Sequence, residues 1–197
     1  MKERGKQMAN SKIIIVEGPQ GTGKTTITDF IRFSLNYTNL YRLCGTSDIT
    51  PAGLKKATIM YENLLTYIKS LENQSINLLF DRTFFTEEVY CRLGLKQYSF
   101  TKEFNRLASH LNNMDFDIYY INLYLKNIFL FEKRLKREGK VAPDYLNFST
   151  DNSIRQQNCY LQLAEEIKEN YKNIKVYNVS NDDSLDDIKE KISNILF

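Results

Sequence analysis

The stretch IIIVEGPQGTGKTT, residues 13–26, combines glycines, a lysine and threonines at a spacing that predicts phosphate binding. Gly18 is followed, after four residues, by Gly23, Lys24 and Thr25, which is the P-loop pattern. The glycines let the backbone curl so that successive N–H groups point inward at a triphosphate. Lys24 would reach the β- and γ-phosphates, and the Thr25 hydroxyl would bind Mg²⁺.

The residues on either side of this loop have the pattern that the chemistry needs. Residues 13–16 are a short β-branched run, typical of a buried parallel strand, and residues 26–35 have helical periodicity. The N-terminus of the following helix would add a positive dipole end near the anion. We therefore predict that a nucleoside triphosphate is held by Gly18, Gln20, Gly21, Thr22, Gly23, Lys24, Thr25 and Thr26.

A second chemical signal is LLFDRTFF, residues 78–85, where Asp81 and Arg82 follow a buried apolar run. A carboxylate at the end of such a strand can hold the Mg²⁺ shell or accept a proton from an attacking oxygen. The adjacent guanidinium can grip an acceptor phosphate with two hydrogen bonds. The structural alternative is an aspartate that caps a helix, with an arginine partner.

The third signal is FEKRLKREGK, residues 131–140, a short helical segment crowded with basic residues. Like charges at helical spacing repel one another, so a polyphosphate partner would make the arrangement reasonable. We predict a cationic lid in which Arg134 and Arg137 stabilise charge on the transferred phosphoryl group and exclude water. Ordinary surface salt bridges are the alternative.

The remaining pattern alternates strands and helices, which indicates a parallel sheet covered on both faces. Ligands of such sheets bind at the carboxyl ends of the strands, where the glycine loop lies. Further strands are predicted at residues 40–43, 76–80, 118–125 and 175–179. Further helices are predicted at residues 51–71, 86–93, 101–111, 128–138, 153–171 and 185–196.

Composition limits the function classes. The chain has 197 residues, of which 42% are hydrophobic, and this suits one domain with a sizeable core. The net charge of +3 gives no nucleic-acid footprint, so no stable nucleic-acid partner is expected. Three cysteines and one histidine show no metal-ligand spacing, which argues against a disulfide framework or a zinc site.

The ends of the chain and its apolar runs bear on location. Residues 1–11 are polar and basic, and we predict a flexible tail there, followed by a single domain at residues 12–197. No apolar run approaches the roughly 18 residues of a membrane span, and the start lacks a signal-peptide core. We therefore expect no membrane contact and a cytoplasmic location.

The order of VEGPQGTGKTT, LLFDRTFF, FDIYYINLYLKNIFLFEKRLKREGK and YLQLAEEIKENYKNIKVYNVSND resembles thymidylate kinase and its relatives among the P-loop nucleoside and nucleotide kinases. The likeness covers nearly the whole chain from Lys12. It implies an α/β fold of three layers, with a five-stranded parallel sheet in the order 2-3-1-4-5 and a helical lid at about residues 131–152. It also implies ATP as donor, Mg²⁺ as cofactor, and transfer of the γ-phosphate to a nucleotide or nucleoside.

The resemblance also implies roles for single residues on the two substrate sides. Lys24 and Thr25 would bind ATP and Mg²⁺, Arg82 would hold the acceptor phosphate, and Asp81 would order the metal water or the acceptor. Arg134 matches a lid arginine of the family. The catalytic set is then Lys24, Asp81, Arg82, Arg134 and Arg137, and the metal would be held by Thr25 and Asp81.

Three further matches have a structural alternative beside them. Arg155 and Tyr160 fit the family's pattern of an arginine and, after four residues, a tyrosine, although core packing explains Tyr160 equally well. Glu17 matches a glutamate that often precedes the loop in thymidylate and deoxynucleoside kinases, and it would otherwise cap the loop.

Departures from the family pattern concern the acceptor. Thymidylate kinases usually have an acidic residue where this chain has Gln20, and an arginine near where it has Met60. The loop GPQGTGKTT also resembles that of herpesvirus thymidine kinases, which phosphorylate nucleosides. We expect a deoxynucleoside monophosphate, with a dTMP-like pyrimidine nucleotide favoured.

Other acceptors and one other function stay open. A nucleoside would need Asp81 or Glu17 as general base on its 5′-hydroxyl, and a nucleotide within DNA is a third acceptor. A nucleotide-dependent regulatory switch is the alternative from another class. The sequence contains neither the Asn-Lys-x-Asp nor the Asp-x-x-Gly motif of a GTPase.

Four aromatic residues flank the expected acceptor cleft: Tyr61, Phe84, Phe85 and Tyr90. Base stacking is one role for them, and packing in the core is the more frequent role of aromatic residues at helical spacing. The resemblance also implies a homodimer, to which the long helix at residues 51–71 would contribute a face.

Overall fold

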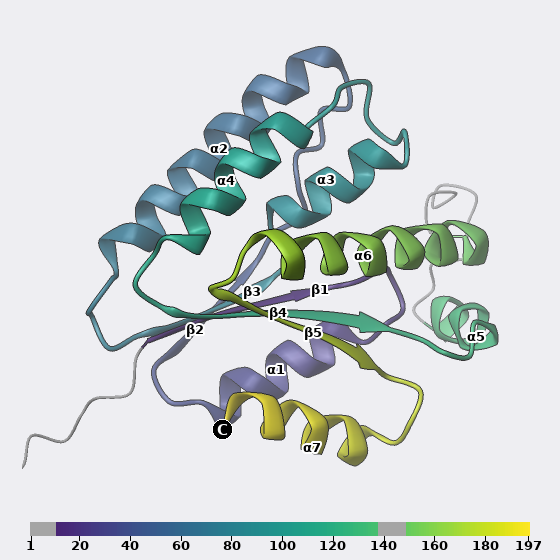
Figure 1. The fold of residues 1–197 in the computed structure, drawn as a ribbon. Helices are drawn as coiled ribbons and strands as arrows, with labels where there is room; N and C mark the ends of the chain where they lie inside the picture. The colour runs from purple at the N-terminus through teal and green to yellow at the C-terminus, as the bar shows by residue number, and fades with distance from the viewer. Residues whose placement is uncertain (1–10, 138–148) are drawn as a thin grey trace, which may run out of the picture.

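The protein is an α/β structure whose computed structural model describes residues 11–137 and 149–197 (Figure 1). The tail expected at residues 1–11 lies, except for Ser11, outside the described residues, and so does the middle of the expected lid at residues 131–152. None of the helices in these two described ranges is long and apolar enough to cross a membrane.

Five strands form one parallel sheet in the order β2-β3-β1-β4-β5, which confirms the expected 2-3-1-4-5 topology. The strand at the centre, β1, pairs with β3 on one side and with β4 on the other. The strands are β1 (Lys12–Glu17), β2 (Thr38–Arg42), β3 (Asn77–Asp81), β4 (Asp117–Tyr124) and β5 (Ile174–Ser180).

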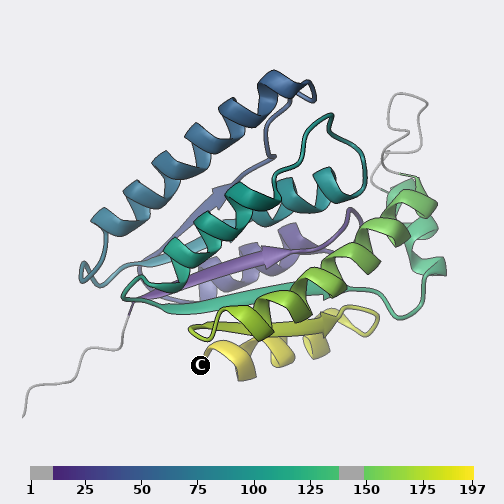
Figure 2. The same ribbon diagram turned by 45° about the horizontal axis from the view of Figure 1, so that its top comes forward.

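Helices cover both faces of the sheet, as Figures 1 and 2 show. One face carries α1 (Lys24–Ser34) and α7 (Leu185–Leu196). The other carries α2 (Pro51–Ser70), α3 (Phe84–Arg92), α4 (Thr101–Asn112) and α6 (Thr150–Asn170). The short helix α5 (Phe129–Arg137) lies beyond the carboxyl end of β4.

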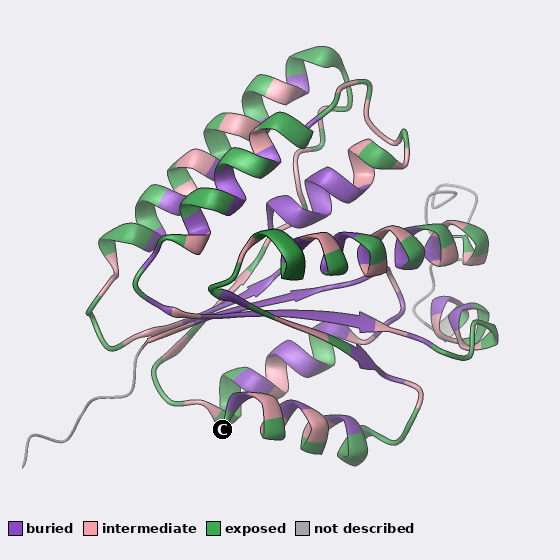
Figure 3. Ribbon diagram, viewed as in Figure 1, coloured by how far each residue is buried: buried purple, intermediate pink, exposed green. Residues whose placement is uncertain are grey.

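The two faces of β1 supply two separate cores. Successive strand side chains point to opposite faces, so Ile13 and Ile15 pack beneath α2, α3, α4 and α6, while Ile14 and Val16 pack against α1 and α7. The central strands β1, β3 and β4 are accordingly buried along most of their length (Figure 3), whereas the outer strands β2 and β5 are largely intermediate or exposed. This is why the strand reads as a continuous apolar run rather than an alternating one.

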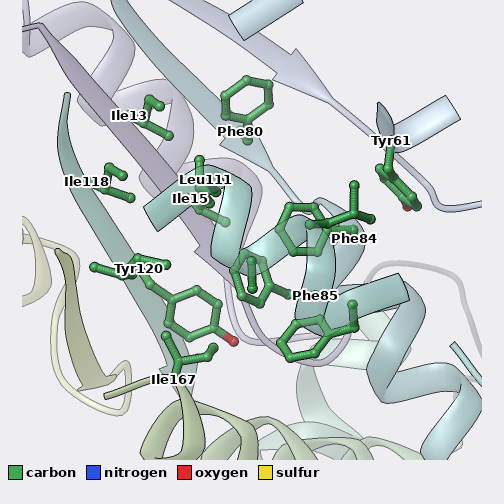
Figure 4. Close-up of a cluster of buried hydrophobic side chains, with 14 of the residues drawn as sticks. Ile13, Ile15, Tyr61, Phe80, Phe84, Phe85, Leu111, Ile118, Tyr120 and Ile167 are labelled. Atoms are coloured by element: carbon green, nitrogen blue, oxygen red, sulfur yellow. The ribbon is translucent and has the colours of Figure 1, made fainter. Parts of the chain in front are cut away.

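Three of the four aromatic residues that flank the expected cleft belong to the larger core (Figure 4). Tyr61, Phe84 and Phe85 are at most 1% exposed. The rings of Phe84 and Phe85 stack with centroids 4.4 Å apart, and Tyr61 packs edge-on to Phe84. The core interpretation is therefore the correct one for these three residues.

The helices α6 and α1 begin earlier than the sequence predicts, because of the residues that precede them. The helix α6 begins at Thr150 rather than at residue 153, because the Ser149 side chain accepts a hydrogen bond from the Asn152 amide and caps the helix. The helix α1 begins at Lys24, two residues earlier than expected, directly after the left-handed Gly23. The P-loop lysine is thus the first residue of the helix.

Candidate functional site

The glycine loop leaves the carboxyl end of the central strand and curls tightly before α1. Gly18 has a φ of +133°, and a Cβ there would lie 2.3 Å from the carbonyl oxygen of Leu123. Gly23 has a φ of +85°, and a Cβ there would lie 2.5 Å from Nδ2 of Asn181. Neither position admits a side chain, because the loop packs closely against Leu123 at Gly18 and against Asn181 at Gly23.

The polar side chains of the loop fit a nucleoside triphosphate with Mg²⁺. Lys24 is buried, and its ammonium donates to the carbonyl of Pro19 at 2.7 Å, so the side chain curls back along the loop. Thr25 and Thr26 are exposed in the first turn of α1. A glycine loop, a lysine and an accessible threonine hydroxyl are parts with which a P-loop holds phosphates and the metal.

Asp81 and Arg82 lie next to this loop, because Asp81 pairs with Val16 in the sheet. The Asp81 carboxylate is buried, and its Oδ2 lies 3.9 Å from Nε of Arg42, at the carboxyl end of β2. Arg42 also forms an ion pair with Asp29 of α1 at 2.5 Å. A carboxylate on the strand beside the P-loop suits the magnesium shell predicted for Asp81.

The Arg82 guanidinium has neutral side chains as its hydrogen-bond partners. One nitrogen donates to the Tyr90 hydroxyl at 2.6 Å, and another lies 3.5 Å from Oε1 of Gln20 in the P-loop. Among the described residues, no carboxylate lies within ion-pair distance of Arg82. An arginine is always charged, so its positive charge remains available to an anionic ligand.

Glu17, the last residue of β1, is fully buried. Its Oε1 accepts hydrogen bonds from the Thr83 amide at 2.7 Å and from the Thr83 hydroxyl at 3.2 Å. Its Oε2 accepts from the Thr86 hydroxyl at 2.6 Å. Burial raises the pKa of Glu17 to about 7, although Thr86 and the Arg82 charge oppose the rise. Both carboxylate oxygens are thus occupied by protein donors.

Arg134 reaches the P-loop from α5, as the lid hypothesis requires. Its guanidinium donates to the carbonyl of Asn181 at 2.6 Å and to that of Gly21 at 3.3 Å. Arg137 is the last residue of α5, and its side chain lies outside the described residues. Arg134 therefore contacts the glycine loop directly, through the carbonyl of Gly21.

Asn181, which is not among the residues predicted from sequence, fastens the loop after β5 to the P-loop. It is buried, and its side-chain amide donates to the carbonyl of Thr22 at 2.7 Å. The rule that singled out Asp81, a polar residue just beyond a buried strand, applies to Asn181 as well. Arg155, in contrast, is exposed on α6, and Tyr160 is buried with its hydroxyl 2.7 Å from that of Thr86.

Another buried carboxylate, that of Glu87 on α3, holds the loop that follows β2. It accepts from the Thr46 amide at 3.0 Å and the Tyr98 hydroxyl at 2.5 Å, and it lies 3.3 Å from the Lys96 ammonium. Lys96 also donates to the carbonyl of Thr46. The loop at residues 43–50 is thereby fixed against α3, whose first turn follows Arg82.

No protein-family model matches the sequence, and no curated protein matches it either. Solved structures do match. A thymidylate kinase from Candida albicans superposes with a TM-score of 0.66 at 17% identity, covering 95% of this chain and 91% of that one.

Two further structures extend the likeness. A thymidylate kinase from Ehrlichia chaffeensis has a TM-score of 0.62 at 15% identity, covering 95% of this chain and all of that one, 100%. A deoxyadenosine kinase from M. mycoides with bound dATP has a TM-score of 0.61 at 18% identity, covering 94% and 98%. The chain has the P-loop nucleoside and nucleotide kinase fold.

This kinase fold puts the residues predicted from sequence at one edge of the sheet. The P-loop follows β1, the Asp81–Arg82 pair ends β3, and Asn181 follows β5. All three lie at the carboxyl ends of parallel strands, where ligands of such folds bind. Tyr90, the fourth aromatic residue considered for base stacking, is half-buried and bonds to Arg82.

Proposed function

We propose that the protein transfers the γ-phosphate of ATP, with Mg²⁺, to a deoxynucleoside monophosphate, with a dTMP-like pyrimidine nucleotide as the favoured acceptor. The P-loop geometry supports the donor half of this proposal. The likeness to two thymidylate kinase structures supports the class of reaction. ATP supplies the phosphoryl group, and the residues of the chain bind, orient and shield it.

The observation that carries the proposal is the position of Arg82. Its guanidinium lies beside Gln20 of the P-loop, and its hydrogen-bond partners are neutral. A monophosphate is an anion whose oxygens match the two-pronged donor face of a guanidinium. Among the described residues no carboxylate lies within ion-pair distance of Arg82, which suits an acceptor that brings its own negative charge to a site beside the P-loop.

The roles of the site residues follow from this arrangement. Lys24 would bind the transferred phosphoryl group, Thr25 and Asp81 would hold Mg²⁺, and Arg82 would orient the acceptor for in-line attack. Arg134 and Arg137 would face the developing charge from the lid. A monophosphate oxygen needs no general base, which agrees with the full occupation of the Glu17 carboxylate.

A deoxynucleoside kinase is the second candidate, and the likeness to a deoxyadenosine kinase supports it. The 5′-hydroxyl of a nucleoside would have to lose a proton to a protein base. Because both Glu17 oxygens are engaged, Asp81 would be that base in this chain. The two candidates share the donor site and differ on the acceptor side.

The test is transfer of label from γ-labelled ATP, in the presence of Mg²⁺, to a panel of acceptors. The panel contains the four deoxynucleoside monophosphates, the matching nucleosides and a DNA oligonucleotide, and Lys24→Ala serves as the blank. We expect label on a monophosphate. Transfer to nucleosides or to DNA alone would overturn the acceptor assignment, and no transfer above the blank would favour a nucleotide-dependent regulatory switch.

The wider organisation is part of the same proposal. Residues 12–197 would form one kinase domain behind a flexible tail, and the lid would span about residues 131–152. The enzyme would act in the cytoplasm on free nucleotides. A homodimer would use the exposed face of α2, where Ile59, Met60 and Tyr67 are each at least 38% exposed.

A further inference from the structure

Arg82 has a backbone conformation that side-chain-bearing residues avoid. Its φ is +72°, and within the described ranges the other non-glycine residues with positive φ are Tyr37, Asn73 and Ser75. Those three are exposed loop residues, whereas Arg82 directly follows a buried strand. A left-handed residue of this kind persists only where its surroundings hold it, and such residues cluster at functional sites.

The peptide groups on both sides of Arg82 are tied to the last two residues of β1. The Arg82 amide donates to the carbonyl of Val16 at 3.1 Å. The next amide, that of Thr83, donates to the Glu17 carboxylate at 2.7 Å. Rotation about φ and ψ turns one peptide group against the other, so anchoring both fixes the direction in which the Arg82 side chain leaves the backbone.

We propose that Glu17 is a positioning residue, whose buried carboxylate holds the left-handed turn at Arg82 and so aims the guanidinium at the acceptor phosphate. The inference rests on the proposed function, in which Arg82 binds that phosphate. It replaces the simpler role of capping the loop, because the hydrogen bonds of Glu17 to described residues go to Thr83 and Thr86.

A carboxylate suits this task because it accepts from several donors at once. Three donors from two residues converge on Glu17. The Thr86 hydroxyl is also hydrogen-bonded to the Tyr160 hydroxyl of α6. Buried charge requires such partners. The charged and titratable groups that face Glu17 are the cations Lys24 and Arg82 and the phenols Tyr61, Tyr120 and Tyr160, whose pKa burial raises well above the usual range.

Four variants separate positioning from general stability. Glu17→Ala and Glu17→Asp cannot reach the Thr83 amide, whereas Glu17→Gln keeps an acceptor oxygen at the same reach. Thr86→Val is the matched control, because it removes a buried hydrogen bond of the same cluster and leaves the Thr83 anchor intact. The Asp variant retains the carboxyl group, so it serves if the Ala variant does not fold.

The first readout is the acceptor KM against the ATP KM. We expect Glu17→Ala and Glu17→Asp to raise the acceptor KM by about tenfold or more, with the ATP KM within about twofold, because only the acceptor arginine is misdirected. Glu17→Gln and Thr86→Val should stay within about threefold of wild type for both substrates. An unchanged acceptor KM in the Asp variant, or equal rises in both KM values, would overturn the proposal.

The second readout does not depend on activity. The Nε–H resonance of Arg82, assigned by its loss in Arg82→Lys, reports where the guanidinium lies. We expect it to shift in Glu17→Asp and to keep its position in Glu17→Gln and Thr86→Val. If wild type transfers no phosphate, the proposed function fails, but this resonance still decides whether Glu17 positions Arg82. The same Nε–H position in wild type, Glu17→Asp, Glu17→Gln and Thr86→Val would refute the positioning role.

Discussion

The side-chain amide of Asn181 donates to the backbone carbonyl of Thr22 at 2.7 Å, so the loop after the last strand is fastened to the P-loop. Arg134 joins the same contact, since it donates to the carbonyls of both Asn181 and Gly21. Three segments far apart in sequence therefore set the shape of the phosphate loop. That contact leads to the first two predictions.

Gly23→Ala should weaken both ATP binding and the fold, because the new Cβ would lie 2.5 Å from Nδ2 of Asn181 in a backbone with φ of +85°. Gly94→Ala is the matched control: its φ is +71°, and nothing lies within 4 Å of the new Cβ. In the control, the free energy of unfolding should fall by only about 1 kcal/mol, the cost of placing an alanine in a left-handed backbone conformation. Urea unfolding and the ATP KM test this, and equal losses in the two variants would contradict the steric argument.

Arg134→Ala should lower kcat by up to about 10³-fold, the upper range for an arginine that stabilises a transferred phosphoryl group. Lys133→Ala, one residue earlier on the exposed side of α5, is the control and should leave kcat unchanged. Steady-state transfer to the best acceptor is the measurement. A drop of the same size in the control would show that general positive charge on α5 matters, rather than this guanidinium.

Protein stability should fall as the pH rises through the titration of Glu17. Burial raises its pKa in the folded state from 4.5 to about 7, so folding favours the protonated form. Its stabilising contribution is full below pH 4.5 and is lost between about pH 4.5 and 7, by at most about 3 kcal/mol. Urea unfolding at pH 5 and pH 7.5 measures this. Glu17→Gln should remove that difference, and a variant as pH-dependent as wild type would contradict the assignment.

Glu87→Gln should destabilise the protein more than Glu88→Gln, although both residues are fully buried neighbours on α3. The Lys96 side chain is 5% exposed and would lose the carboxylate that lies 3.3 Å away, which costs about 3 kcal/mol for a broken buried pair. Arg92, the partner of Glu88, would keep its two bonds to Glu166. Denaturant unfolding at pH 7 compares the variants, and equal losses would count against a buried pair at Glu87.

The sequence predicted those parts of the site that follow from strand order. The P-loop, Asp81 and Arg82 were found because buried strands are visible as apolar runs and their carboxyl ends must share one edge of the sheet. Arg134 is predicted by a different signal, the crowding of basic residues at helical spacing within residues 131–140.

The parts that escaped prediction depend on side-chain contacts between distant segments. Asn181 bonds to a residue 159 positions away, and the left-handed turn at Arg82 depends on the Glu17 carboxylate 66 positions from Thr83. No local pattern predicts either contact, although the position of Asn181 just beyond a buried strand is a signal for the residue itself. For Tyr61, Phe84 and Phe85, helical spacing alone did not distinguish a ring in the core from a ring at the cleft, and burial in the structure decided it.

The end of β1 bears on how far this chain can change its length. Val16 and Glu17 hold the turn at Arg82, and the next residue, Gly18, opens the phosphate loop. The separation between the arginine and the loop is therefore set by a few consecutive covalent bonds. One residue inserted or deleted at that junction would alter this spacing, whereas length changes in the loop at residues 71–76, at the opposite edge of the sheet, would leave it intact. The chain should consequently tolerate insertions and deletions better in the loop at residues 71–76 than at the end of β1.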